Sequence, residues 1–111
     1  MAQEYPVYGR IDGPIVMIGF GSIGKGTWPL IERHFDYDAD KFTVIEPDAR
    51  QANFLRQHKL NHLQVSLTPE NYREVLGGLF SGGNGFCVNL SVDTSSLDIM
   101  KFCREIGVLY I

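Results

Sequence analysis

Three glycines near the start of the chain have the spacing of a phosphate-binding turn. Gly19, Gly21 and Gly24 follow the pattern G-x-G-x-x-G, which Gly-rich loops also produce by chance. Here the pattern starts where the apolar run Ile15–Ile18 ends and leads into a helical pattern, the context that dinucleotide binding requires. The first glycine permits a tight turn, the second lets the backbone approach a pyrophosphate, and the third lets the helix pack close to the strand. Phosphate is further attracted by the helix N-terminus. We therefore expect five residues to contact the cofactor here: Gly19, Gly21, Ser22, Ile23 and Gly24.

An acidic residue follows at the position expected for a ribose contact. Glu46 comes directly after the apolar run Phe42–Ile45 and lies 22 residues after Gly24. A carboxylate at this place accepts hydrogen bonds from the adenosine ribose and repels a 2′-phosphate, so it favours NAD over NADP. The nearby Arg50 weakens that preference. The alternative is a solvated acid at a strand end, but strand position and spacing agree on the ribose role.

A polar loop after a later apolar run is the third candidate. It covers residues 89–96, and its predicted cofactor contacts are Asn89, Leu90, Ser91 and Thr94. In a doubly wound sheet this loop lies at the switch point where ligands bind. The alternative is a helix N-cap, which needs only one of its Ser or Thr residues. Asp93, the one carboxylate of the loop, could attract a cationic substrate or could complement the helix N-terminus. Both readings of Asp93 remain open from the residues alone.

The elements that would position these residues alternate regularly along the chain. Short apolar runs predict strands at 15–18, 42–45, 63–67, 86–90 and 108–111, and helical patterns cover 22–35, 48–58, 68–80 and 96–106. Helical crossovers between strands make the sheet parallel. We predict a Rossmann-type doubly wound α/β sheet with strand order 3-2-1-4-5.

The domain boundaries follow from the same pattern. Residues 1–14 are expected to form an irregular N-terminal arm, 36–40 a polar loop, and 15–111 the nucleotide-binding domain. A full arrangement of this kind has a sixth strand, and the chain stops within the fifth apolar run. We therefore expect an incomplete domain, with any substrate domain outside this chain.

Composition excludes several classes of protein. The chain has 111 residues, a formal net charge of −3, an isoelectric point near 5.5 and 44% hydrophobic residues. An acidic chain without a basic cluster argues against nucleic-acid binding. No apolar run approaches the roughly 20 residues that cross a bilayer, and the N-terminus does not have the pattern of a secretory signal. A cytoplasmic location is the simplest expectation.

The remaining reactive side chains have structural interpretations. The three histidines are not spaced as ligands, so no metal site is predicted. Cys87 and Cys103 are expected to be small buried hydrophobes. Trp28 is expected to face outward, against a part of the protein that this chain lacks. The helix at 96–106 is apolar on two sides, which fits either an additional interface or deep burial.

Long stretches around these residues resemble bacterial homospermidine synthases, in a wider family similar to saccharopine dehydrogenases. The resemblance is carried by residues 10–24, 29–35, 71–76 and 85–96, and it is weakest over 48–68. The family often has Asp at the position of Glu46, which keeps the carboxylate. This resemblance is much more specific than the glycine pattern.

The resemblance implies an enzyme that uses NAD as a tightly held redox group. In that family one putrescine is oxidised to an imine and loses ammonia, a second diamine attacks, and the new imine is reduced by the same cofactor. The product is homospermidine, from putrescine, spermidine or both. Asp93 matches an acidic position that would hold a diamine ammonium group. Most of the catalytic pocket would lie beyond residue 111, so no catalytic residue is assigned, this segment alone is expected to be inactive, and the longer protein is expected to be a homodimer.

Two other functions compete with this interpretation. One is a different NAD-dependent oxidoreductase with a saccharopine dehydrogenase-like architecture. The other is a non-enzymatic Rossmann module that senses nucleotides, like the regulatory domains of potassium channels. The match through residues 89–96 favours the synthase over the sensor.

Overall fold

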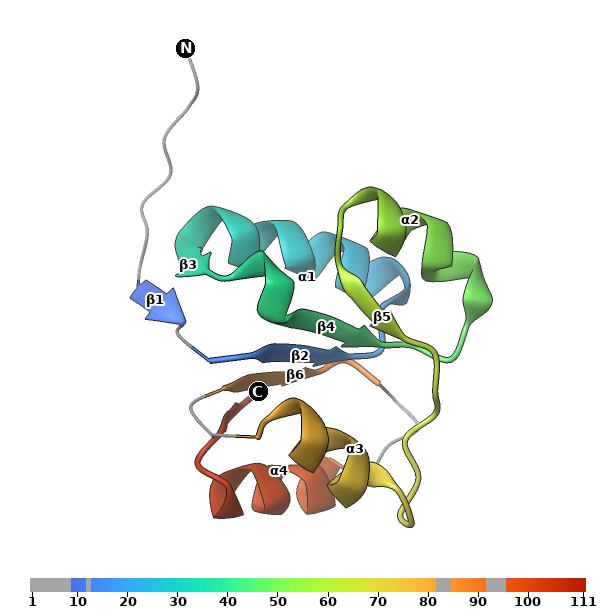
Figure 1. Cartoon of the computed structure of the whole chain (residues 1–111). Coiled ribbons are helices and arrows are strands. Elements are labelled where there is room, and N and C mark those ends of the chain that lie inside the picture. The colour runs from blue at the N-terminus through green and yellow to red at the C-terminus, as the bar shows by residue number, and fades with distance from the viewer. Residues whose placement is uncertain (1–8, 12, 82–84, 92–95) are drawn as a thin grey trace.

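A parallel five-stranded sheet forms the centre of the structure (Figure 1). The computed structural model describes residues 9–11, 13–81, 85–91 and 96–111. Its main sheet has the order β5-β4-β2-β6-β7, and every neighbouring pair is parallel. The strands are β2 (Ile15–Ile18), β4 (Phe42–Ile45), β5 (Asn61–Leu63), β6 (Phe86–Asn89) and β7 (Leu109–Tyr110). Numbered among themselves along the chain, these strands have the order 3-2-1-4-5, which confirms the predicted Rossmann-type α/β fold.

Helices cover both faces of this sheet. They are α1 (Gly21–His34), α2 (Ala52–Gln57), preceded by the short 3₁₀ helix η2 (Ala49–Gln51), α3 (Tyr72–Leu79) and α4 (Ser96–Glu105). Figure 1 shows α1 and α2 on one face and α3 and α4 on the other. Within the described residues, no helix is long and apolar enough to span a bilayer.

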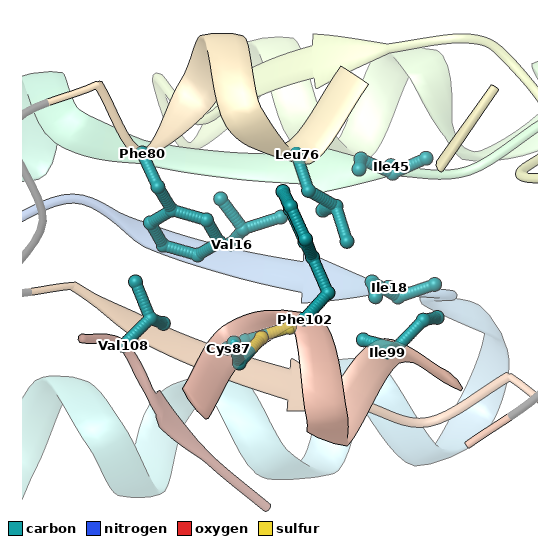
Figure 2. Close-up of a cluster of buried hydrophobic side chains, with 10 residues drawn as sticks. Val16, Ile18, Ile45, Leu76, Phe80, Cys87, Ile99, Phe102 and Val108 are labelled. Atoms are coloured by element: carbon teal, nitrogen blue, oxygen red, sulfur yellow. The ribbon is translucent and has the colours of Figure 1, made fainter. Parts of the chain in front are cut away.

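The core is divided into two clusters because β2 is buried on both faces. Val16 and Ile18 point toward α3 and α4, where Leu76, Phe102 and their neighbours fill the first cluster (Figure 2). Ile15 and Met17 point the other way, toward α1 and α2. The uninterrupted apolar run of β2 therefore has a direct structural cause.

Two predictions about buried side chains have opposite outcomes. Cys87 and Cys103 are fully buried in the first cluster, as expected. Trp28 is only 7% exposed and packs against Phe54 and His58, so the predicted outward position is wrong. Phe54 of α2 and His58 just after it provide partners that helical spacing in α1 could not indicate.

Helix α4 buries one of its two apolar sides and part of the other. Ile99, Phe102 and Cys103 lie in the core, whereas the side chains of Leu97 and Met100 are exposed. Gly107 follows the helix with φ +74°, the left-handed conformation expected of a C-terminal stop.

A second, two-stranded sheet was not predicted. Strand β1 (Gly9–Ile11) pairs in parallel with β3 (Phe35–Tyr37), and the 3₁₀ helix η1 (Ala39–Lys41) follows. The expected irregular arm thus contains a strand, and so does the expected loop at 36–40. Strands of three residues are too short to give an alternating pattern, so their pairing was not visible in the sequence.

Two predicted boundaries also differ from the structure. The predicted strand at 63–67 lies earlier, because Val65 donates its N–H to the carbonyl of Leu63 and turns the chain away from β4. The helix predicted to start at Thr68 starts at Tyr72. Thr68 and Asn71 instead exchange hydrogen bonds between side chain and backbone, at 2.7 and 3.2 Å, in the preceding turn.

The register of the sheet brings three chain segments to one edge. Ile18 at the end of β2 lies opposite Ile45 of β4 and Asn89 of β6. The following residues stay hydrogen-bonded: Gly19 donates its N–H to Ile45 (2.8 Å), and Leu90 donates its N–H to Ile18 (2.8 Å). The glycine turn, Glu46 and the loop after β6 therefore adjoin one another.

Candidate functional site

The first glycine of the turn is required by both its conformation and its neighbour. Gly19 has φ +82°, which L side chains rarely adopt. A Cβ at Gly19 would lie 3.2 Å from the backbone nitrogen of Ser91, in the loop after β6. The turn after β2 and the loop after β6 are thus packed backbone to backbone.

The second and third glycines have different surroundings. Gly21 also has positive φ, and a Cβ there would meet no atom within 4 Å, so the turn leaves open space at the N-terminus of α1. This is the room that a pyrophosphate needs at a helix N-terminus. A Cβ at Gly24 would lie 2.8 Å from the ring of Phe20. Gly24 thus makes room for the Phe20 ring. The sequence had suggested a different role, close packing of the helix on the strand.

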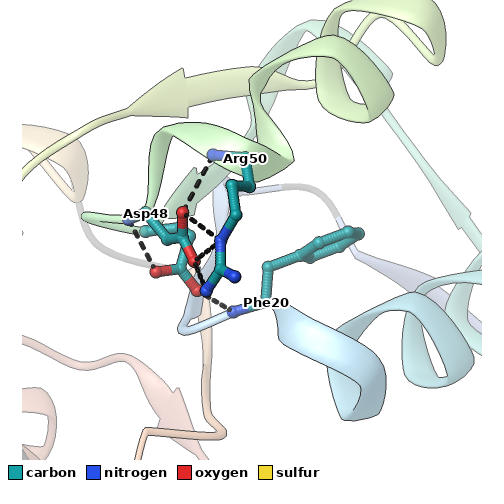
Figure 3. Close-up of polar contacts among 4 residues, drawn as sticks. Phe20, Asp48 and Arg50 are labelled. Atoms are coloured by element: carbon teal, nitrogen blue, oxygen red, sulfur yellow. Dashed lines mark hydrogen bonds and ion pairs between the residues drawn. The ribbon is translucent and has the colours of Figure 1, made fainter.

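Glu46 joins the end of β4 to the glycine turn. Its Oε1 accepts a hydrogen bond from the N–H of Phe20 (2.9 Å), and its Oε2 accepts one from the N–H of Asp48 (3.0 Å), as Figure 3 shows. The side chain is partly buried. Its carbonyl oxygen contacts the Nε2 of His62 on β5 at 2.8 Å. Hydrogen bonds therefore hold the Glu46 side chain against the turn. A solvated acid at a strand end would not be held in this way.

An exposed ion pair lies beside Glu46. Asp48 caps η2 by accepting the backbone N–H of Arg50 at 2.9 Å. The guanidinium of Arg50 then contacts both oxygens of Asp48, with Nε at 3.1 and 2.9 Å and Nη2 at 2.6 Å. The hydrogen bonds from Arg50 hold the pKa of Asp48 below its ordinary value, and those to Asp48 raise the pKa of Arg50. Sequence reasoning noted Arg50 but missed Asp48, whose role appears only from these contacts.

The loop after β6 is shaped by the side chain of Asn89. Its Oδ1 accepts the N–H of Ser91 (3.0 Å), and its Nδ2 donates to the hydroxyl oxygen of Tyr110 on β7 (3.1 Å). Both polar atoms of this amide are thus engaged within the protein. Tyr110 was also missed by the sequence analysis, because only the pairing of β6 with β7 brings it to this loop.

The other predicted site residues divide into two groups. Ser22 and Ile23 lie in the first turn of α1, and Leu90 lies in the loop after β6. Asp93 and Thr94 lie outside the described residues. No group of three or more potential His, Cys, Asp or Glu metal ligands occurs in the part of the chain that the structure describes.

A positive-φ glycine turn at a helix N-terminus, with an acid fixed beside it, defines a nucleotide-binding domain of the Rossmann type. Comparison with known families agrees: the family model described as "Saccharopine dehydrogenase NADP binding domain" matches residues 15–111. The chain belongs to this family.

Individual relatives confirm the resemblance to homospermidine synthases. The chain is 54% identical over 114 residues to the homospermidine synthase of Mesorhizobium japonicum, covering 100% of this chain and 24% of that protein. It is 57% identical over 110 residues to the enzyme of Blastochloris viridis, covering 97% and 23%. The chain thus spans about a quarter of the length of the curated relatives it matches.

A solved structure has the same fold. The homospermidine synthase of Legionella pneumophila, in complex with NAD, superposes with a TM-score of 0.81 at 30% sequence identity. The match covers 91% of this chain and 22% of that one.

Proposed function

We propose that this chain is the NAD-binding part of a homospermidine synthase. The observation that carries the proposal is the 54–57% identity to two homospermidine synthases over essentially the whole chain. The structural relative in complex with NAD supports the choice of cofactor. So does the carboxylate of Glu46, because an acid at this position repels a 2′-phosphate.

The chain's own residues would hold the cofactor by backbone groups more than by charge. The N-terminus of α1 and the open space at Gly21 would take the pyrophosphate, and Glu46 would take the adenosine ribose. The loop that begins with Asn89, Leu90 and Ser91, together with Thr94, would line the nicotinamide half. When bound, NAD supplies a hydride acceptor and then a hydride donor. The reaction would make homospermidine from putrescine, spermidine or both without net oxidation.

Asp93 would bind the substrate. Its place in the loop after β6 and its match to an acidic position of the family support contact with a diamine ammonium group. We further propose, from the family resemblance alone, that the other catalytic groups belong to the portion of the relatives that this chain does not cover, and that the enzyme is a cytoplasmic homodimer.

Product analysis tests the proposed reaction. The protein at its natural length, given putrescine and NAD, should form homospermidine without accumulating NADH. Accumulation of NADH without homospermidine would point to a saccharopine dehydrogenase-like oxidoreductase instead. Asp93→Asn should raise KM or lower turnover while the affinity for NAD is kept; loss of NAD binding would contradict its substrate role.

A binding comparison tests the cofactor site separately. Gly21→Ala should weaken NAD at least about tenfold, since its methyl group enters the space reserved for the pyrophosphate. Gly107→Ala is the matched control, because Gly107 also has a positive φ (+74°) and a Cβ there also meets nothing within 4 Å, but it follows α4, away from the turn. Equal NAD affinity in both variants would argue against the assigned site.

A further inference from the structure

The ion pair between Asp48 and Arg50 lies beside Glu46, the residue that would distinguish NAD from NADP. Figure 3 shows both side chains beside the turn that carries Phe20, and Glu46 contacts the backbone of Asp48 and of Phe20. An arginine near this acid is the usual means of accommodating a 2′-phosphate. Here the guanidinium is already engaged by a carboxylate, through three contacts of 2.6–3.1 Å.

The charges in this corner oppose a phosphate. Two carboxylates, Glu46 and Asp48, face one guanidinium, so the corner carries a net negative charge at neutral pH. The Asp48 carboxylate is ionised at neutral pH, and its hydrogen bonds with Arg50 lower its pKa from the ordinary value of 3.8. A phosphate group would therefore meet repulsion from two acids and only one cation, which is already paired.

Because the side chain of Arg50 is exposed, the ion pair with Asp48 can break without disturbing the core. The Arg50 side chain is 87% exposed and that of Asp48 is 32% exposed. Exposed ion pairs contribute little to folding stability. Without the Asp48 charge, a long exposed arginine side chain could turn toward a phosphate with little change to the fold.

We propose that Asp48 is a cofactor-specificity residue: it occupies the guanidinium of Arg50 and so denies that cation to the 2′-phosphate of NADP. This inference rests on the proposed function and deepens it. Glu46 would then discriminate by direct contact with the ribose, and Asp48 would discriminate by holding Arg50 away.

The test is a double-mutant cycle on dinucleotide binding. Asp48→Asn keeps a side-chain oxygen to cap η2 but removes the charge that holds Arg50. The Kd values for NAD and NADP are measured by calorimetry for the wild type, Asp48→Asn, Arg50→Ala and the double variant. Asp48→Asn should bind NADP about tenfold more tightly, because a freed arginine can form charge-assisted bonds to phosphate, with NAD affinity changed less than about threefold. In the double variant, compared with Arg50→Ala, most of that gain should disappear, because only the repulsion from Asp48 is then relieved.

Asp38→Asn is the matched control. Asp38 also accepts a backbone N–H two residues along, from Asp40 at 3.0 Å, but it lies before β4, at the opposite end of the strand from Glu46. The Asp38→Asn variant should leave the ratio of NAD to NADP affinity unchanged. An unchanged ratio in Asp48→Asn overturns the proposal, and so does an equally large gain without Arg50, since charge removal alone would then explain it. If the wild type binds neither dinucleotide, the proposed function fails, and this inference fails with it.

Discussion

The side chain of Glu46 accepts a hydrogen bond from the backbone N–H of Phe20, 26 residues earlier in the chain, at 2.9 Å. The acid of the second predicted strand is thereby fixed to the middle of the glycine turn of the first. Its position is set by the backbone of the turn, so a change at Glu46 acts on both cofactor selectivity and the geometry of the turn.

Glu46→Arg should reverse the preference between the two dinucleotides. The cation would attract the 2′-phosphate and remove the acceptor for the ribose hydroxyls, so NADP should bind more tightly than NAD. Titration of both dinucleotides checks this, with Glu70→Arg on an exposed residue outside the site as control. Unchanged discrimination would exclude the ribose role of Glu46.

Gly19→Ala should destabilise the fold even in the absence of any ligand. The new Cβ would require a left-handed backbone and would press on the backbone of Ser91 at 3.2 Å, at a cost of about 1–3 kcal/mol. Gly26→Ala in α1 should instead stabilise the protein by up to about 1 kcal/mol, because alanine favours a helix. Urea unfolding of both variants measures the difference; equal stability would contradict the tight packing of the two loops.

Tyr110→Phe should loosen the loop that follows β6. Loss of the hydrogen bond with the Asn89 amide should cost about 0.5–1.5 kcal/mol of the free energy of unfolding. In Asn89→Ala the tyrosine change should have almost no additional effect, because the bond is already missing. Additive losses in the double variant would show that the two residues act independently.

The stability of the domain should fall in alkaline solution because of the buried thiol of Cys87. The hydrogen bond with Cys103, together with burial, raises the pKa of Cys87 above its ordinary value of 9.0. The thiol therefore stays neutral in the folded state and ionises on unfolding, so its contribution is complete below pH 9 and is lost as pH rises further. The same hydrogen bond lowers the pKa of Cys103, and that shift changes stability only below pH 9. Unfolding free energies from pH 9 to 11 should therefore decline by up to about 1.4 kcal/mol per pH unit because of Cys87. The variant Cys87→Ala/Cys103→Ala, less stable overall, should show a shallower decline; an equally steep one would assign the effect to other groups.

The sequence predicted those parts of the structure in which a single local requirement, such as burial or an unusual backbone angle, dictates the residue type. Strand β2 is apolar throughout because it is buried on both faces, and the glycines of the turn adopt conformations or contacts that other residues cannot. The parallel sheet followed from the alternation of strands and helices, and the strand order followed from the Rossmann arrangement that the glycine pattern indicates.

The parts that were missed depend on contacts between distant segments. The position of Trp28 depends on Phe54 of α2 and on His58 just after that helix, and the pairing of β1 with β3 involves only three residues in each strand. Asp48 and Tyr110 look ordinary along the chain. Their relation to the site depends on side-chain geometry, which periodicity does not encode.

The central place of β2 also predicts the order in which its two neighbouring strands pair with it. Ile15 pairs with Phe42 on one side and with Phe86 on the other, so during synthesis the first partner emerges from the ribosome long before the second. Because loop closure becomes slower and costlier with chain separation, β2 and β4 should pair first and β6 should add later. Until then the most apolar strand has one open edge, and the turn beside Gly19 is complete only when the last of its neighbours, Ser91, has been made.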